Sequence, residues 1–458
     1  QEEVSNNFEK LQPWAQVYLR NMIDVVENAT KSNEDARIKY ANLLAVLNNV
    51  EKNYRGGIDG ARRMELVAMR GEENSEFQTW LSTAERKAKY GDVLAELRAL
   101  VDRETVSARR AKLLRFLGIG AWMESTGRTL YRWAKEREKP DAERQRGFQE
   151  RDVVRATERL KAMDRRYDPS VEPALMAFAL GEYSKLPADA RIPAWDKAFG
   201  ISKAAYNSDA VARRVSAMIK KSKLGDLKNR LALFEKSAQE LEASKDPFIQ
   251  LAVASYEREI ELEEAAKARA GESIDVRGRY MAALLEFNEE RGRPIYADAN
   301  STLRISFGSV LGSMPKDGLR YDAFTTIDGL AAKHTGEVPF DSPETQLELI
   351  RKGDHGPFYH RLYQSVPVNF LCTLDITGGN SGSPILNARG DLVGLAFDGT
   401  YEGIISDWAF DRSNSRTIAV DVRYMLWVMS KVDGAYRLLE EMGVADFKPR
   451  AARRAGRH

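Results

Sequence analysis

The spacing of apolar residues changes once along this chain, and the change predicts two parts with different folds. From about residue 6 to about residue 292, apolar residues recur every three or four positions, as on one face of an α-helix. After Gly292-Arg293-Pro294, polar and apolar residues alternate, which is typical of half-buried β-strands. A length of 458 residues allows two or three domains. We therefore predict an α+β protein, with an all-α domain over residues 1–292 and a β-rich domain over residues 293–448.

The predicted helices begin and end at recognisable signals. Pro13 suits a first helical turn, and the apolar residues of that helix's buried face are Trp14, Tyr18, Met22 and Val25. Ser32 is the predicted N-cap, with Asp35 three residues later, of a second helix that the pair Gly56-Gly57 would stop. Further helices are predicted over residues 92–116, 144–166, 205–222, 226–243 and 247–292.

The second part has the pattern of an antiparallel sheet. Strands are predicted over Thr302–Phe307, Pro367–Leu374, Pro384–Asn387 and Leu392–Phe397. The last two flank Ala388-Arg389-Gly390-Asp391, which has the composition of a hairpin turn. A helix over Val422–Lys431 is expected to pack back onto the strands, and another is predicted over Tyr436–Met442.

The charge balance argues against a nucleic-acid or membrane-surface partner. Lys and Arg total 70 and Asp and Glu total 68, so no global field favours a polyanion. The basic end, Lys448 to His458, is predicted to be a solvated tail (residues 449–458) rather than a nucleic-acid arm. Because no apolar run approaches ~20 residues, no membrane span is predicted.

Histidine and cysteine are scarce. The four histidines stand at positions 334, 355, 360 and 458, so the helical part has no histidine for acid–base chemistry or metal binding. His355 and His360 lack a Cys or Glu at the spacing of zinc ligands, and we predict no metal site and no cofactor. Cys372 is the single cysteine, which excludes an internal disulfide in this chain. Its apolar strand predicts a buried, inert thiol rather than a nucleophile.

One motif points to chemistry, the run Gly378-Gly379-Asn380-Ser381-Gly382-Ser383-Pro384. A nucleophilic serine in acyl transfer needs an exposed hydroxyl on a tight turn, with backbone N–H groups directed at the oxygen that becomes negative. We predict Ser381 as the nucleophile and the amides of Gly379 and Ser381 as the oxyanion hole. A polar loop between strands is the alternative, but a strand leads into the motif and a strand and hairpin follow it, as in chymotrypsin-like proteases.

These residues resemble a known family. Gly378–Asn387, followed by Gly390–Gly399 and preceded by Asp298–Arg304, is similar to the bacterial dipeptidyl-peptidase 7/11 family of serine exopeptidases. The similarity extends from the helical segment to near the end of the chain and is strongest from Tyr296 to Ser406. It implies a chymotrypsin-like double β-barrel with a large α-helical domain inserted in it, the helices capping the cleft.

The resemblance also implies where the partners of Ser381 lie. In the family, the catalytic His and Asp precede the helical insertion, and this sequence starts at that insertion. His334, His355 and His360 follow the helical region, so none of them matches the catalytic base. We expect the His and Asp to lie upstream of residue 1, in an N-terminal part of the same catalytic domain, and the isolated chain to be inactive.

Three further residues correspond to substrate contacts of the family. Asp398 matches the carboxylate that binds the free α-amino group through charge-assisted hydrogen bonds, with a plain turn aspartate as the alternative. Asn53, in Lys52-Asn53-Tyr54-Arg55, matches a second amino-end contact; the alternative is an ordinary helix-end residue. Gly399 matches the floor of the S1 pocket, where an arginine accompanies acidic P1 residues and a glycine leaves an apolar pocket, although it could simply serve the Asp-Gly turn. Gly399 therefore suggests the type 7 branch and a hydrophobic P1.

The expected function is that of a serine-type dipeptidyl-peptidase. By resemblance, its partners are peptides with a free N-terminus, it forms a homodimer, and it is periplasmic. A catalytically dead homologue that binds peptides or proteins is the alternative from another class. An endopeptidase of similar barrel fold is a further alternative.

Overall fold

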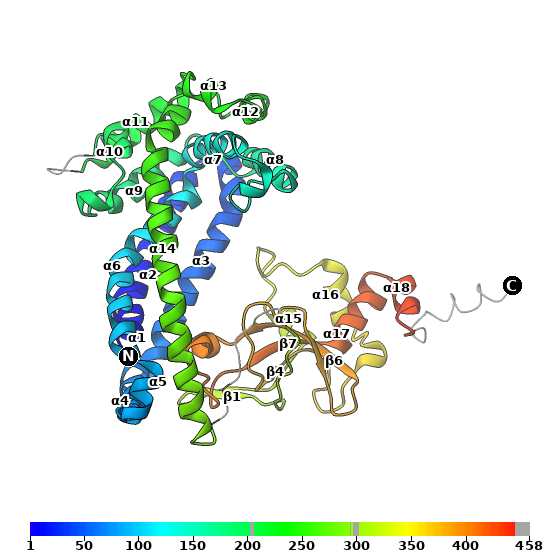
Figure 1. Ribbon diagram of the computed structural model, residues 1–458. Helices are drawn as coiled ribbons and strands as arrows, with labels where there is room; N and C mark the ends of the chain where they lie inside the picture. The colour runs from blue at the N-terminus through cyan, green and yellow to red at the C-terminus, as the bar shows by residue number, and fades with distance from the viewer. Residues whose placement is uncertain (202–205, 294, 296–301, 445–458) are drawn as a thin grey trace. The chain divides into compact units, whose positions relative to one another are not determined.

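A computed structural model describes the chain apart from residues 202–205, 294, 296–301 and 445–458, and apart from the side chains of residues 105 and 106. The chain forms two compact units. The first comprises Gln1–Arg55 with Val67–Ile295, and the second comprises Gly56–Leu66 with Tyr296–His458 (Figure 1). The predicted basic tail, His458 and the stretch Asp298–Ser301 of the family motif lie outside the described residues.

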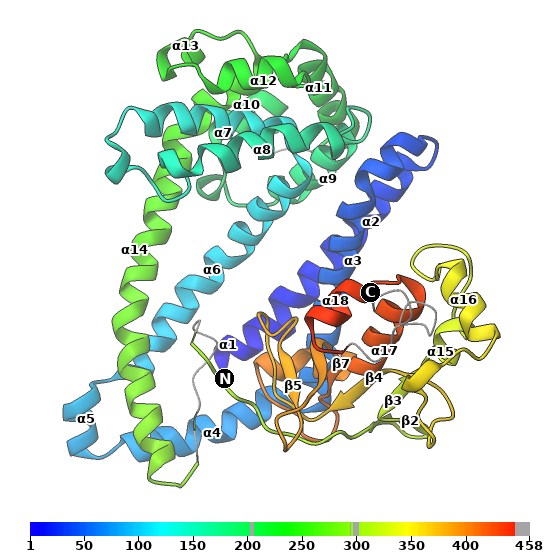
Figure 2. The ribbon, with the colours of Figure 1, turned by 90° about the vertical axis from the view of Figure 1, so that its right-hand side faces the viewer.

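The first unit is helical, as the periodicity predicted. After a short helix α1 (Glu2–Ser5) and a π-helical turn, its main helices are α2 (Gln12–Thr30), the first part of α3 (Glu34–Arg63), α4 (Leu66–Leu81), α5 (Ala84–Tyr90), α6 (Val93–Gly120), α7 (Trp122–Arg137), α8 (Val153–Ala162), α9 (Glu172–Ser184), α10 (Pro193–Phe199), α11 (Ser208–Lys221), α12 (Leu227–Phe234), α13 (Ala238–Glu242) and α14 (Pro247–Glu289). The longest, α14, has 43 residues and extends from α13 to α5 (Figures 1 and 2). No helix in the described part of the chain is long and apolar enough to cross a membrane.

The main core of this unit forms where α2, α6, α9 and α11 meet. The predicted face of α2 is confirmed, because Tyr18 and Met22 are buried and Trp14 and Val25 pack against the same cluster. The ring of Tyr18 stacks on that of Phe116 in α6, with their centroids 5.1 Å apart. Burial of such a continuous apolar face is the main source of helix stability in a globular protein.

Two predicted helix boundaries were wrong. The N-cap of α3 is Asn33 rather than Ser32, because the Asn33 side chain accepts a hydrogen bond from the amide of Ala36 at 3.1 Å. The pair Gly56-Gly57 does not stop α3, which continues to Arg63. Tertiary contact overrides the weak helix propensity of glycine here. Residues 56–66 consequently group with the second unit, whereas the sequence pattern placed them within the domain of residues 1–292.

The second unit is built on an antiparallel sheet followed by helices. Its elements are the end of α3, β1 (Ser313–Lys316), β2 (Leu319–Tyr321), β3 (Phe324–Thr326), α15 (Ile327–Ala332), α16 (Glu344–Arg351), β4 (Pro367–Cys372), β5 (Pro384–Leu386), β6 (Leu392–Gly399), the 3₁₀-helix η7 (Tyr401–Asp407), β7 (Thr417–Asp421), α17 (Val422–Trp427) and α18 (Tyr436–Glu441). Among the described residues, β1 and β2 form a two-stranded sheet, and a five-stranded sheet has the order β3-β4-β7-β6-β5. Figure 2 labels β5, β7, β4 and β3 across this second sheet. The α+β class is confirmed.

The centre of the sheet is an apolar core. Phe370 and Cys372 of β4 pack with Ala419 of β7, and Phe370 pairs with Ala419 across the ladder. A Cβ at Gly394 of β6 would lie 2.6 Å from the ring of Phe370, so only glycine lets the ring cross this strand. The hairpin β5–β6 is confirmed, with Gly390 at φ +83° in its turn. Trp427 of α17 is fully buried in a second cluster.

The predicted strand Thr302–Phe307 was wrong. Residues 303–309 have no regular structure, and Leu303 and Phe307 are 93% and 87% exposed. An alternating sequence can form a strand only where another strand completes its hydrogen-bond ladder. No strand of the described chain pairs with this segment, and the first bridge to the sheet is between Val310 and Cys372.

Candidate active site

The turn around Ser381 joins β4 to β5, and two of its residues must be glycine. Gly379 has φ +108° and Gly382 has φ +87°, values that side chains with a Cβ rarely adopt. A Cβ at either position would meet nothing within 4 Å. The requirement for glycine therefore comes from the backbone conformation and not from crowding, as expected for a turn that presents its central residue to solvent.

Hydrogen bonds fix this turn at both ends. At its start, the amide of Thr377 donates to Oδ1 of Asn380 at 3.1 Å, and the amide of Asn380 donates back to the Thr377 carbonyl at 3.2 Å. At its end, the amide of Gly382 donates to the carbonyl of Ala396 at 2.7 Å, and the amide of Ala396 donates to the carbonyl of Ser383 at 3.0 Å. The turn is thus attached to β6, the strand that carries Asp398.

The hydroxyl of Ser381 is exposed and weakly held. Its Oγ donates to the carbonyl of Phe397 at 3.4 Å, which is long for a hydroxyl donor. In the described chain, the amides of Gly379 and Ser381 donate no hydrogen bond to another protein group. Exposed amides without an internal partner are free to bind an oxygen of a substrate.

The histidines of the described chain are engaged elsewhere. His334 Nδ1 accepts from the amide of Ser342 at 3.0 Å, while His355 and His360 stack on Tyr359 and Tyr363. None of the three forms a hydrogen bond with Ser381. Among the described residues, Ser381 therefore has no hydrogen bond to a histidine.

Asp398 and Gly399 end β6, two residues beyond the predicted end of that strand. A bulge between Ala396 and Asp398 interrupts the register with β7. The Asp398 side chain is exposed, and its Oδ1 accepts the amide of Gly399 at 2.8 Å. Gly399 is also exposed, and a Cβ there would meet only the carbonyl oxygen of Arg416 at 3.7 Å. Both residues are accessible, and Gly399 has room for a side chain.

Arg416, whose backbone carbonyl lies beside Gly399, has a buried cationic side chain that the sequence did not reveal. Its side chain is enclosed, and its guanidinium donates only to carbonyl oxygens, those of Leu311, Gly312, Arg412, Ser413 and Ser415. Burial lowers the pKa of this group. Since every nitrogen of Arg416 already has an acceptor, it serves to hold the loop before β7 together. A lone arginine in a polar loop gives no sequence signal for such a role.

Two further predicted residues, Asn53 and Cys372, belong to other elements. Asn53 belongs to the first unit and lies exposed within α3, not at the end of a helix. Cys372 is buried in β4, and burial raises the pKa of its thiol, so the prediction of a buried thiol is confirmed. In the described part of the chain, no three His, Cys, Asp or Glu side chains form a group that could hold a metal ion.

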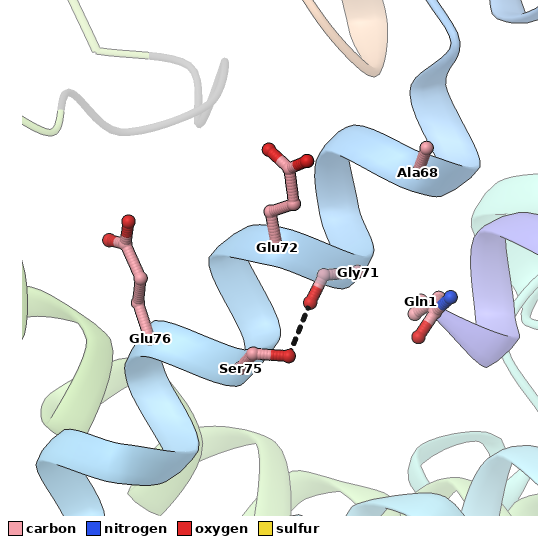
Figure 3. A pocket seen from close by; sticks show the side chains of 6 residues that line it. All are labelled: Gln1, Ala68, Gly71, Glu72, Ser75 and Glu76. Carbon is pink, nitrogen blue, oxygen red and sulfur yellow. Dashed lines mark hydrogen bonds between the residues drawn. The ribbon is translucent and has the colours of Figure 1, made fainter.

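A cavity of about 640 Å³ lies in the first unit, lined by Gln1, Ala68, Gly71, Glu72, Ser75 and Glu76. Figure 3 shows it between Gln1 and α4, where Ser75 Oγ donates to the carbonyl of Gly71 at 3.0 Å. The carboxylates of Glu72 and Glu76 point away from Gln1 (Figure 3). None of the predicted site residues lines this cavity, and we assign it no function.

Comparison with known proteins shows which family this chain resembles. The model of the family Peptidase S46 matches residues 1–444. An Asp/Glu-specific dipeptidyl-peptidase of Shewanella putrefaciens is 35% identical over 443 residues, which cover 92% of this chain and 59% of that protein. Dipeptidyl-peptidase 7 of Capnocytophaga gingivalis is 29% identical over 435 residues, covering 93% of this chain and 58% of that protein. The chain thus spans about three-fifths of the length of these curated relatives.

The fold has a counterpart among solved structures. Porphyromonas endodontalis DPP11 in complex with the dipeptide Arg-Glu superposes with a TM-score of 0.75 at 23% identity, over 96% of this chain and 61% of that one. At this identity, the likeness establishes the shared fold, and the chemistry has to be argued from the residues themselves.

Proposed function

The chain belongs to the peptidase S46 family, and on that premise we propose that the complete enzyme releases dipeptides from the free amino end of peptides, with Ser381 as its nucleophile. The observation that carries this proposal is the turn at residues 377–383. It holds an exposed, weakly bound hydroxyl beside two amides that have no acceptor in the described chain.

The proposed reaction is acyl transfer in two steps. A histidine from outside the described chain accepts the Ser381 proton, and Oγ attacks the scissile carbonyl. The amides of Gly379 and Ser381 stabilise the oxyanion, a contribution of roughly 2.7 to 4 kcal/mol for each donor. The histidine then protonates the leaving amine, and water hydrolyses the acyl-enzyme. The family resemblance is the ground for proposing that the His and Asp lie in a part of the same catalytic domain outside this chain, which spans about three-fifths of its curated relatives.

Two exposed side chains are proposed to bind the amino end. The carboxylate of Asp398 carries the charge needed to pair with a substrate ammonium, and one of its oxygens is already oriented by the amide of Gly399. Asn53 is proposed as a second contact on the strength of the family resemblance. Because the bound ammonium lies two residues before the scissile bond, the enzyme would cleave the second peptide bond from the free amino end of its substrate.

We propose a hydrophobic P1 preference from Gly399. The two relatives compared above carry different names, one Asp/Glu-specific and one dipeptidyl-peptidase 7, so their names do not decide between the two preferences. A carboxylate bound in a pocket without a cation would be desolvated and unpaired, at a cost of several kcal/mol. The guanidinium of Arg416 is buried, and each of its three nitrogens already donates to a backbone carbonyl, so we do not propose it as the cation of a P1 pocket.

The test uses the complete enzyme with unblocked and N-acetylated versions of one peptide. We expect dipeptide release from the unblocked peptide only, and loss of that release in Ser381→Ala. A fluorophosphonate probe should label the wild-type enzyme and not the variant. A folded wild-type enzyme that is not labelled would instead be a binding module, the alternative that the missing base leaves open, and cleavage of the acetylated peptide would identify an endopeptidase.

A further inference from the structure

The 3₁₀-helix η7 (Tyr401–Asp407) connects the two halves of the candidate site within the second unit. It begins two residues after Gly399, at the end of the strand that carries Asp398. The residue between, Thr400, is buried and pairs with the loop before β7, its amide donating to the carbonyl of Arg416 at 2.9 Å. The start of η7 therefore has a fixed position relative to Gly399.

The other end of η7 holds the start of the nucleophile turn. Asp407, its last residue, accepts a hydrogen bond from Oγ1 of Thr377 at 2.8 Å through Oδ1. Thr377 is also the residue on which the turn closes, since its amide and carbonyl both bond to Asn380. The residue next to Asn380 is Ser381. A single side-chain contact thus links η7 to the backbone that positions the nucleophile.

The end of α3 supports the middle of η7. A Cβ at Gly56 would lie 2.4 Å from Cδ1 of Ile404, and a Cβ at Gly60 would lie 2.6 Å from Cβ of Ile405. These two glycines, one helical turn apart, allow the backbone of α3 to approach η7 more closely than any other residue would permit. This close approach of α3 to η7 therefore requires glycine at both positions.

Polar contacts complete this support. The hydroxyl of Tyr401 donates to Oδ2 of Asp59 at 2.7 Å, and Nη2 of Arg63 donates to the carbonyl of Glu402 at 2.9 Å. Arg63 also forms an ion pair with Asp411, in the loop after η7, at 3.4 Å. The segment Gly56–Arg63 therefore fixes η7 by backbone proximity, by hydrogen bonds and by charge.

We propose that η7 is a positioning element for Ser381, and that Thr377 and Asp407 are the positioning residues through which it acts. The inference rests on the proposed role of Ser381 as nucleophile. Neither residue touches the substrate; the Thr377–Asp407 bond holds the turn so that the Ser381 hydroxyl and the two amides keep one geometry. A misplacement of about 1 Å is enough to slow an acyl transfer markedly.

A purely structural role would give a different result from a positioning role. Thr377→Val removes the donor and keeps the shape of the side chain, while Asp407→Ala removes the acceptor. Asp407→Asn keeps an oxygen acceptor for Thr377, so it is the conservative variant. Ser406→Ala is the matched control, because Ser406 belongs to η7 but bonds to Ser415, away from the nucleophile turn.

The experiment measures the rate of fluorophosphonate labelling of Ser381, kcat and KM for a dipeptidyl substrate, and the thermal unfolding midpoint, all in the complete enzyme. We expect Thr377→Val and Asp407→Ala to slow labelling and lower kcat by about threefold to tenfold, with a smaller change in KM. Asp407→Asn and Ser406→Ala should stay close to wild type.

The outcomes separate this inference from the proposed function. Labelling of the wild-type enzyme with equal labelling of folded Thr377→Val and Asp407→Ala would overturn the positioning role and leave Ser381 as the nucleophile. A folded wild-type enzyme that the probe does not label would overturn the role of Ser381 and the inference with it. A lower unfolding midpoint at an unchanged labelling rate would assign the Thr377–Asp407 bond to stability alone.

Discussion

Asp398 and Gly399 are adjacent residues with different chemistry at the end of one strand. The first presents an exposed carboxylate, and the second presents open space beside a backbone carbonyl. A carboxylate can bind a substrate ammonium, whereas the open space admits a side chain without supplying a charge. Under the proposed function, Asp398 would set the distance from the free amino end and Gly399 would set which P1 residue is accepted.

The role of Gly399 is tested by giving its position a charge. Gly399→Arg should fold, because a Cβ at this position makes only an ordinary contact at 3.7 Å and the backbone there does not require glycine. In the complete enzyme, we expect the ratio of kcat/KM for Glu over Leu at P1 to rise about tenfold or more, since a guanidinium pairs with a carboxylate. Gly399→Gln adds a side chain without charge and should not favour Glu. Equal profiles for the two variants would show that Gly399 does not set the P1 preference.

The local backbone could be predicted from sequence where the signal is local, whereas the roles of the residues stay predictions. The turn at Ser381 was predicted because its glycines and its serine are close neighbours, and the two glycines indeed have positive φ. Arg416 and the Thr377–Asp407 pair were missed. Thr377 and Asp407 are 30 positions apart along the chain, and two of the carbonyls that Arg416 binds, those of Leu311 and Gly312, are more than 100 positions away. Nothing in a threonine, an aspartate or an arginine alone indicates which distant residue it will bond to.

At the scale of elements, α3 shows how a distant contact can overrule a local signal. Gly56-Gly57 normally weakens a helix by roughly 1 kcal/mol per residue relative to alanine. Here the helix continues because Gly56 and Gly60 lie against η7, and their lack of a side chain is what allows that packing. Helix propensity describes the isolated segment and carries no information about Ile404 or Ile405.

The contact between Gly56 and Ile404 predicts that one substitution lowers stability and that a second substitution restores it. Gly56→Ala should lower the thermal unfolding midpoint, because its Cβ overlaps Cδ1 of Ile404 and overpacking costs about 1 to 3 kcal/mol. Ile404→Val removes that carbon, so adding it should restore much of the loss. Gly278→Ala in α14, where a Cβ meets nothing within 4 Å, should be neutral or stabilising. A Gly56→Ala midpoint as high as that of Gly278→Ala would disprove the close approach.

Periodicity was a guide to about half of the main elements, and the strands β1, β2, β3 and β7 and the helices α4, α5, α7, α9, α10, α15 and α16 were not predicted individually. Helices form where one face is apolar, and the strands β4, β5 and β6 form where the alternation is bounded by turn residues. The segment Thr302–Phe307 has the same alternation and forms no strand in the structure. Alternation reports that a segment is able to pair, but pairing also needs a neighbouring strand, and the sequence pattern does not specify one.

The net charge of the chain is close to zero, but this balance gives no sign that several carboxylates of the helical unit are buried. Glu124 of α7 and Glu172 of α9 are almost fully buried, and the side chain of Glu259 in α14 is 18% exposed. Arg128 lies 3.5 Å from Glu124 and 3.9 Å from Glu259, so one guanidinium serves two carboxylates. Since Arg128 is itself 42% exposed, water screens its charge, and the burial of the acids is only partly compensated.

Burial decides the direction in which these groups titrate. It raises the pKa of Glu259 to about 7, with the attraction of Arg128 opposing the shift and Glu124 adding to it. Burial also raises the pKa of Glu124 and that of Glu172. A carboxyl group whose pKa is higher in the folded state than in the unfolded chain makes the folded state bind more protons. The stability that it contributes is complete below the unfolded pKa and is lost as the pH rises toward the folded pKa.

The helical unit should therefore become less stable as the pH rises from 4.5, the ordinary pKa of a glutamate, toward about 7, the pKa of Glu259 in the folded protein. The shift corresponds to a free energy of unfolding on the order of 3 kcal/mol. Glu259→Gln removes this titration but keeps an acceptor for Ser255 Oγ, which donates to Oε1 of Glu259 at 2.7 Å. Thermal unfolding midpoints measured across that range should fall less steeply in Glu259→Gln than in the wild type, whereas Glu257→Gln, at an exposed position of the same helix, should follow the wild type. Equal pH dependence in all three proteins would mean that Glu259 is well solvated or fully paired with Arg128, and the burial of its carboxylate would then carry no cost.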